Sequence, residues 1–79
     1  MAYPNPVQSG SQLNIKIFSD SNIELNNGTI EVYDLKGVRL SSTKVQGFIT
    51  PISIKSTPGV YIVRLRSDDL VEDMKIIVQ

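Results

Sequence analysis

The sequence predicts an all-β protein, folded as an antiparallel β-sandwich of about six or seven short strands. Apolar and polar residues alternate with a period of two in several runs, and turn-forming residues separate these runs. No segment has the 3.6-residue apolar stripe of a long amphipathic helix. A small, partly open barrel is the alternative. We favour the sandwich because no run has the length or the glycine bends that barrel closure needs.

Each predicted strand has an apolar face that can turn toward a core. The runs cover residues 13–17, 30–33, 38–41, 52–54, 60–66 and 70–78. The side chains predicted to point inward include Leu13, Ile15, Ile17, Ile30, Val32, Ile54, Tyr61, Val63, Leu65 and Ile76. In the run at 38–41, Val38 and Leu40 alternate with polar neighbours in the same way. Residues 19–27 are mostly polar and predict a short edge strand or a loop.

Two turns can be assigned from their residue types. Asp34-Leu35-Lys36-Gly37 fits a type I turn closed by a left-handed glycine, which is a common connection in β-hairpins. Thr57-Pro58-Gly59-Val60 fits a type II turn, with proline and glycine at its two central positions. Both assignments predict a positive φ, at Gly37 and at Gly59.

The composition limits the functions open to this chain. Its 79 residues make one small domain with a thin core, which leaves little room for an enzyme pocket. Eight basic and eight acidic residues cancel, which argues against nucleic acid or an anionic membrane as the main partner. The chain has no histidine and no cysteine, so it lacks the commonest general base and the commonest metal ligands.

Clusters that might carry chemistry have simpler explanations. They are an acidic group and two Ser-Lys pairs: Asp68, Asp69, Glu72 and Asp73; Ser53 with Lys55; and Ser42 with Lys44. The acidic group lacks the alternating oxygen ligands and the central glycine of a calcium loop. The lysines of the pairs are expected in solvent, where lysine is a poor base. We therefore predict no catalytic residue, no metal site and no cofactor, and hence no enzymatic activity.

Two sets of side chains remain open to a binding role. Tyr33, Phe48 and Tyr61 either line a sugar-binding face or belong to the core. A second set forms either a basic stripe or a solvated face paired with Glu31 and Asp73; it consists of Arg39, Arg64, Arg66 and Lys75.

Four short blocks stand out by their order along the chain. They are Tyr3-Pro4-Asn5-Pro6; Tyr33-Asp34 with the turn glycine Gly37; Gly59 with Tyr61; and Lys75-Ile76-Ile77-Val78. In this order, and spanning nearly the whole chain, they resemble the type A C-terminal sorting domain carried by cargo of the type IX secretion system of Bacteroidota. At Asp73-Met74-Lys75 the chain departs from the pattern, because many members have two adjacent basic residues there.

The resemblance implies a non-enzymatic export signal with an immunoglobulin-like sandwich fold. It implies recognition by the outer-membrane type IX translocon and cleavage upstream of Tyr3 by a sortase-like peptidase. The protein would pass through the periplasm and reach the outer membrane, the cell surface or the medium. Residues 3–79 would form the sorting domain of a longer cargo protein, with Met1 and Ala2 as an added start. The candidate recognition residues lie in these blocks; they are Tyr3, Pro4, Asn5, Pro6, Asp34, Gly37, Gly59, Tyr61, Lys75, Ile76, Ile77 and Val78.

Two other classes of function stay open at this point. One is a carbohydrate-binding or adhesive module, and the other is a purely structural immunoglobulin-like module of a secreted bacterial protein. Independently of function, the strand near Leu13 or the last strand is expected at a sheet edge. With no net charge, such an edge predicts a weak homodimer formed by strand pairing.

Overall fold

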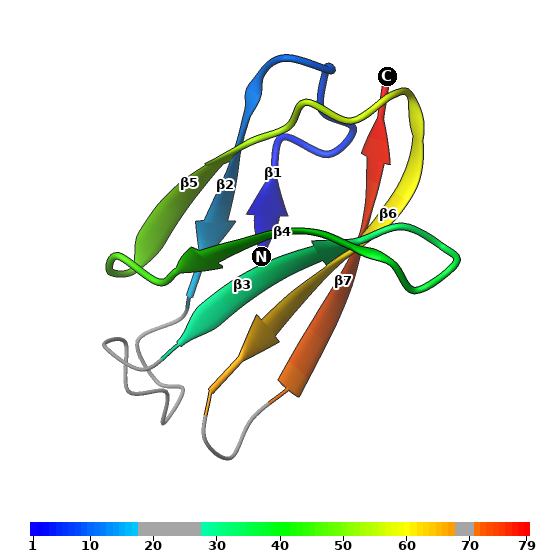
Figure 1. Ribbon diagram of the computed structural model, residues 1–79. Helices are drawn as coiled ribbons and strands as arrows, with labels where there is room; N and C mark the ends of the chain where they lie inside the picture. Colours follow the sequence, from blue (N-terminus) through cyan, green and yellow to red (C-terminus); the bar gives the residue numbers. More distant parts are fainter. Residues whose placement is uncertain (18–27, 68–70) are drawn as a thin grey trace.

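The computed structural model describes residues 1–17, 28–67 and 71–79, which form two antiparallel sheets. The smaller sheet has the order β1-β2-β5 and the larger the order β4-β3-β6-β7 (Figure 1). Their bounds are β1 Ala2–Tyr3, β2 Gln12–Lys16, β3 Thr29–Tyr33, β4 Arg39–Lys44, β5 Ile49–Ser53, β6 Gly59–Arg66 and β7 Val71–Val78. The predicted all-β fold is confirmed. Within the described ranges, no helix has the length and apolar character needed to cross a membrane.

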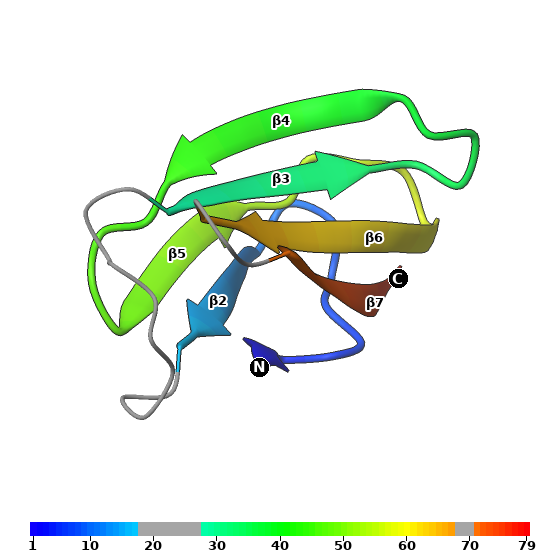
Figure 2. The same ribbon diagram turned by 90° about the horizontal axis from the view of Figure 1, so that it is seen from below.

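The core lies between the two sheets, which Figure 2 shows as separate layers. All ten side chains predicted to point inward are buried. Leu13 and Ile15 of the smaller sheet and Val63 and Ile76 of the larger one are completely shielded from solvent. Because successive side chains of a strand point to opposite faces, the period-two pattern was sufficient to identify this set. A sandwich, rather than a barrel, is therefore the observed arrangement.

Strand β4 differs from the expectation that its apolar residues are half-buried. Val38 is 54 % exposed and Leu40 is 46 % exposed. The four-stranded sheet is wider than the three-stranded sheet that faces it, and β4 lies at its edge. The β4 residues opposite the buried Ile30 and Val32 are the polar Thr43 and Ser41, and Val38 precedes the strand. Nearly all of β4 is therefore exposed.

The β3–β4 hairpin has the predicted turn. The amide of Gly37 donates to the carbonyl of Asp34, and Gly37 has a φ of 87°. The Asp34 carboxylate accepts hydrogen bonds from the amides of Lys36 and Val38, so this side chain stabilises the turn locally.

The prediction of a type II turn at residues 57–60 is wrong. The φ of Gly59 is positive, as predicted, but at 157° it is close to extended backbone. A type II turn needs a value near +80° at this position. Gly59 is instead the first residue of β6, where it pairs with Val78 of β7.

Of the two strands expected at a sheet edge, the last one, β7, is the edge strand of the larger sheet, whereas β2 is internal. Strand β2 lies between β1 and β5. The last residues of β7 pair with the segment that follows β1, through a parallel bridge between Val7 and Val78. The peptide bonds that precede Pro4 and Pro6 in this segment are cis. The segment at 19–27, together with Asp68 and Asp69, lies outside the described residues.

Candidate functional site

The opening and terminal blocks of the chain, about seventy residues apart, form one surface. The Asn5 side chain donates from Nδ2 to the carbonyl of Lys75 over 3.1 Å. Its Oδ1 accepts a hydrogen bond from the amide of Ile77 over 3.0 Å. Next to it, Val7 exchanges two backbone hydrogen bonds with Ile77 and Gln79, each 2.8 Å long. The candidate residues at both ends of the sequence therefore belong to a single site, which we call the terminal edge (residues 5–9 and 75–79).

Alternation along β7 divides the residues of the terminal block between two faces. Ile76 and Val78 are buried in the core, and Val7 is buried beside them. Lys75 and Ile77 point outward, and Ile77 is 40 % exposed. Pro4 and Pro6 are exposed, while Tyr3 is half-buried in β1. The surface that a partner could contact at this end thus combines a lysine, an isoleucine and two prolines.

The outer face of the larger sheet brings further candidate residues next to the terminal edge. The strand registers place Ile62 of β6 between Tyr33 of β3 and Lys75 of β7. In the next row, Arg64 lies between Glu31 and Asp73. The block at Tyr33-Asp34 is therefore two strands away from the terminal lysine, although more than forty residues separate them along the chain.

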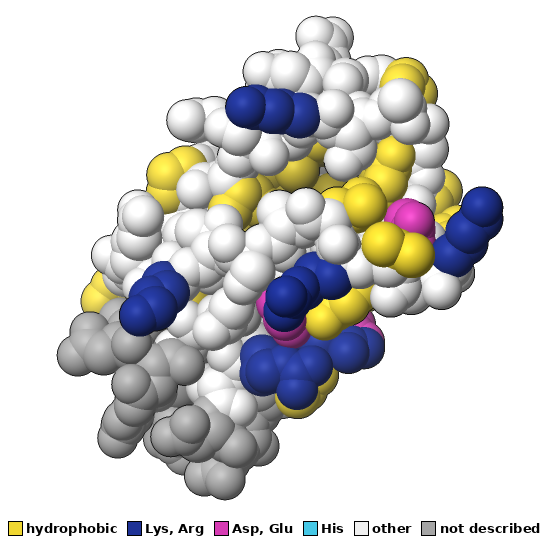
Figure 3. Space-filling model, in the orientation of Figure 1, with side chains coloured by type: hydrophobic (Ala, Val, Ile, Leu, Met, Phe, Trp, Pro, Cys, Tyr) yellow, Lys and Arg dark blue, Asp and Glu magenta, His cyan; other side chains and the backbone are white. Residues whose placement is uncertain are grey.

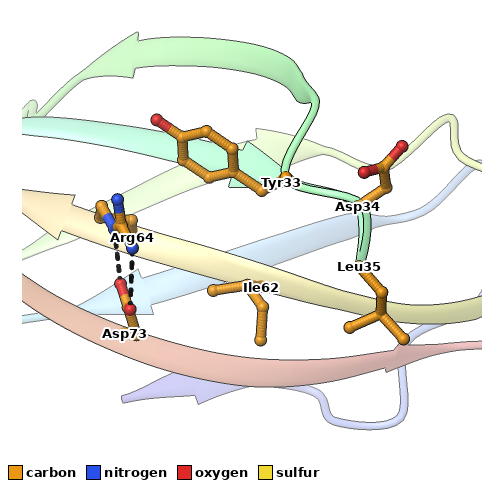
Figure 4. A pocket seen from close by; sticks show the side chains of 7 residues that line it. Tyr33, Asp34, Leu35, Ile62, Arg64 and Asp73 are labelled. Atoms are coloured by element: carbon orange, nitrogen blue, oxygen red, sulfur yellow. Dashed lines mark hydrogen bonds and ion pairs between the residues drawn. The ribbon is translucent and has the colours of Figure 1, made fainter.

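An open hollow of about 300 Å³ lies at this place, and its walls include Tyr33, Asp34, Leu35 and Ile62 (Figure 4). Arg64 forms one side. Its guanidinium lies over the Tyr33 ring, 5.2 Å from the ring centre. It also pairs with the Asp73 carboxylate through two hydrogen bonds of 2.8 and 3.1 Å.

The ion pair between Arg64 and Asp73 shifts the pKa of both side chains. Hydrogen bonds from Arg64 lower the pKa of Asp73, and the bonds to Asp73 raise the pKa of Arg64. Arginine is charged at any ordinary pH, so only the lowered pKa of Asp73 changes the charge of this site. The hollow keeps its ion pair over the whole range in which Asp73 is ionised.

Glu31 is the buried carboxylate of this sheet, and two arginines hold it. Its side chain accepts hydrogen bonds from Arg39 at 3.2 Å and from Arg66 at 3.1 Å. Burial by itself raises the pKa of Glu31, but the hydrogen bonds from Arg66 and Arg39 outweigh this effect and lower it. Figure 3 shows Lys and Arg side chains gathered around acidic ones on this face. The set Arg39, Arg64 and Arg66 is therefore a paired face rather than a continuous basic stripe.

The remaining candidate block is divided, because Gly59 is exposed and Tyr61 belongs to the core. Tyr61 is 8 % exposed, and its hydroxyl donates to the carbonyl of Thr57 over 2.6 Å. The three aromatic side chains considered for sugar binding do not share one face. Tyr33 lies on the outer face of the larger sheet, Tyr61 is buried, and Phe48 is exposed beside β5 of the smaller sheet.

The described members of the acidic group and of the two Ser-Lys pairs are exposed on the surface. Among the described residues, no three acidic side chains come together in a way that could hold a metal ion. Ser42 and Lys44, and likewise Ser53 and Lys55, are exposed. Hydrogen-bonding, cationic and aliphatic groups remain for contact with a partner.

Sequence reasoning missed several features of this site. It treated the opening block as a stiff segment or a recognition element, and it did not connect Asn5 with β7. It also passed over Val7, which is completely buried between the sheets. The only available signal for Val7 was an isolated apolar residue directly after a proline. No local pattern indicated that Glu31 would be buried together with Ile30 and Val32 on either side of it.

Comparison with known proteins agrees with the arrangement of these blocks. No curated protein matches the chain at a significant level. A family model described as the secretion system C-terminal sorting domain matches residues 1–79, which is the whole chain. Members of this family are sorting signals of type IX secretion cargo, generally without catalytic activity. The protein therefore belongs to the family of secretion system C-terminal sorting domains.

Proposed function

We propose that this domain is a type A sorting signal without enzymatic activity, recognised by the outer-membrane type IX translocon. Membership of the family supports transport of a cargo protein to the cell surface or the medium. The finer assignment concerns which part of the domain is recognised. We place recognition at the terminal edge, together with the adjoining outer face of the larger sheet.

One observation carries this assignment. Asn5 binds the backbone of β7 at Lys75 and Ile77, so the opening block and the terminal block form one continuous surface. The side chains of Lys75 and Ile77 are exposed there, and they take no part in the core. A surface built from both ends of the domain exists only when the sandwich is folded. Recognition at this place would therefore test the folding of the signal as well as its sequence.

The remaining steps follow from the same proposal. A sortase-like peptidase cuts upstream of Tyr3 once the cargo has crossed the outer membrane. The domain passes through the periplasm with its cargo, and the cargo then stays at the cell surface or enters the medium.

The test is a fluorescent periplasmic reporter fused to residues 1–79 in a bacterium with a working type IX system. The complete tag is expected to deliver fluorescence to the surface or medium. Removing residues 75–79 deletes half of β7 and should retain the reporter in the periplasm. Lys75→Glu should keep the fold, since this lysine is exposed, and should lower delivery because it reverses the charge at the terminal edge.

Lys44→Glu serves as the matched control, because Lys44 is also exposed but lies on β4, at the opposite edge of the sheet from β7. It should leave delivery unchanged. Surface delivery of a reporter whose tag lacks residues 75–79 would refute the proposed function. Normal delivery with Lys75→Glu would remove only the role assigned to that charge.

A further inference from the structure

The hydrogen bonds along the outer edge of β7 form the ladder of a parallel strand pair. The backbone amide of Ser9 donates to the carbonyl of Gln79 over 3.0 Å. The amide of Val7 donates to the carbonyl of Ile77, and the carbonyl of Val7 accepts from the amide of Gln79. In a parallel ladder, alternate residues of one strand bond to the partner strand. Residues 7 and 9 follow this rule. The next bonding position toward the N-terminus is residue 5, whose main-chain groups would face Lys75 and Ile77.

At this position a side chain takes the place of the backbone. A regular ladder would need the N–H of residue 5 to donate to Lys75 and its C=O to accept from Ile77. The Asn5 side chain makes both bonds, with Nδ2 as the donor and Oδ1 as the acceptor. An asparagine side chain carries the same amide group as a peptide bond. Its two neighbours in the sequence, Pro4 and Pro6, have no N–H to offer.

We infer that Asn5 is a positioning residue, which extends the ladder by one rung and so holds Lys75 and Ile77 in place on the terminal edge. This inference rests on the proposed function and names the part that the opening block plays in it. Asn5 acts through β7, and the translocon does not contact it directly. Its amide also occupies the backbone groups of Lys75 and Ile77, so the partner contacts their side chains instead of adding a strand at this place.

The residue type follows from the geometry. Alanine would remove both bonds and leave the Ile77 amide without its partner. Aspartate has nearly the same shape and retains an acceptor for Ile77, but it has no donor for Lys75 and would place a negative charge against that carbonyl. Both substitutions should therefore loosen the outer edge of β7 at Lys75 and Ile77, although β7 stays paired with β6 on its other side. The core should remain intact, because Asn5 is exposed and Val7 still anchors the segment.

The test combines amide hydrogen exchange, read residue by residue by NMR, with delivery of the fluorescent reporter. In Asn5→Ala the Ile77 amide should exchange about tenfold faster, as expected for the loss of two exposed hydrogen bonds. The amide of Val63, in the centre of β6, should keep its exchange rate and so report an intact fold. Reporter delivery should fall in Asn5→Ala and in Asn5→Asp. Gln12→Ala is the control, since Gln12 is exposed on β2 and lies outside the terminal edge.

Each outcome of this experiment decides the inference. Faster exchange at Ile77 together with reduced delivery supports it. An unchanged Ile77 rate in Asn5→Ala would overturn it, and so would normal delivery despite a released Ile77. Reduced delivery with an unchanged Ile77 rate would also overturn it, because Asn5 would then be contacted directly. If the unmodified tag failed to deliver the reporter, the proposed function would fail, while the exchange measurement would still show whether Asn5 holds β7.

Discussion

Replacing Glu31 with glutamine is expected to destabilise the domain by about 1 kcal/mol at neutral pH. Hydrogen bonds to a charged group contribute about 1.5–3 kcal/mol each when they are shielded from water. Here the side chain of Glu31 is 8 % exposed, but the side chains of Arg39 and Arg66 are 59 % and 49 % exposed. Water screens such pairs to roughly 1 kcal/mol or less each, and a neutral amide is easier to bury than a carboxylate, which offsets part of the loss.

The pH dependence gives a sharper test than the magnitude. The pKa of Glu31 is lower in the folded protein than in the unfolded chain. The carboxylate therefore contributes stability above its unfolded value of about 4.3, and this contribution is lost as the pH falls through the folded value. Glutamine does not titrate. The difference in stability between the natural domain and Glu31→Gln should be complete near pH 7 and should shrink below about pH 4.

Urea unfolding, followed by circular dichroism at several pH values, measures this difference. In thermal unfolding, a loss of about 1 kcal/mol would lower the melting temperature by roughly 4–8 °C for a domain of this size. Glu72→Gln is the matched control, because Glu72 is exposed on β7. It should change stability little at any pH. A Glu31→Gln variant as stable as the natural domain at pH 7, or a difference that stays constant down to pH 3, would refute the reasoning.

The remaining predictions concern one turn and the association state. Gly37→Val should cost about 1–2 kcal/mol in thermal unfolding. Gly37 has a φ of 87° with open space around it, so the cost comes from backbone strain alone. An unchanged melting temperature would contradict this. The weak homodimer remains a prediction, and with β2 internal it should pair through β4 or the first half of β7. Sedimentation that shows only monomer at millimolar concentration would exclude it.

The local features of this protein could be predicted from its sequence. Alternation with period two identified β2, β3, β5, β6 and β7 and ten of the side chains that face the core, because the direction of a side chain follows from its position along the strand. It did not identify Val7, which lies outside any alternating run. The Asp34–Gly37 turn was equally accessible, since its hydrogen bonds join residues at most four positions apart. The order of the blocks along the chain also indicated the family, which matches over its whole length.

The neighbours of each strand were decided by the tertiary structure. An alternating pattern shows which side chains share a face, but it contains no information on which strands lie side by side. The exposure of Leu40 depends on the register of the edge strand β4, which places Ser41 and Thr43 opposite the buried residues of β3. Glu31 and Arg64 are each a charged residue between apolar residues of a strand, so their sequence patterns are alike. Burial of Glu31 is favourable because Arg39 and Arg66 pair with its carboxylate.

The terminal edge is the clearest case of this division. Asn5 and Ile77 are 72 positions apart, and nothing in the residues around Asn5 indicates a partner at such a distance. The two meet because the segment after β1 leaves the smaller sheet and continues the ladder of the larger one. The composition of both blocks was visible in the sequence. That they form one surface depends on the packing of the two sheets, which closes the sandwich and brings the ends of the chain together.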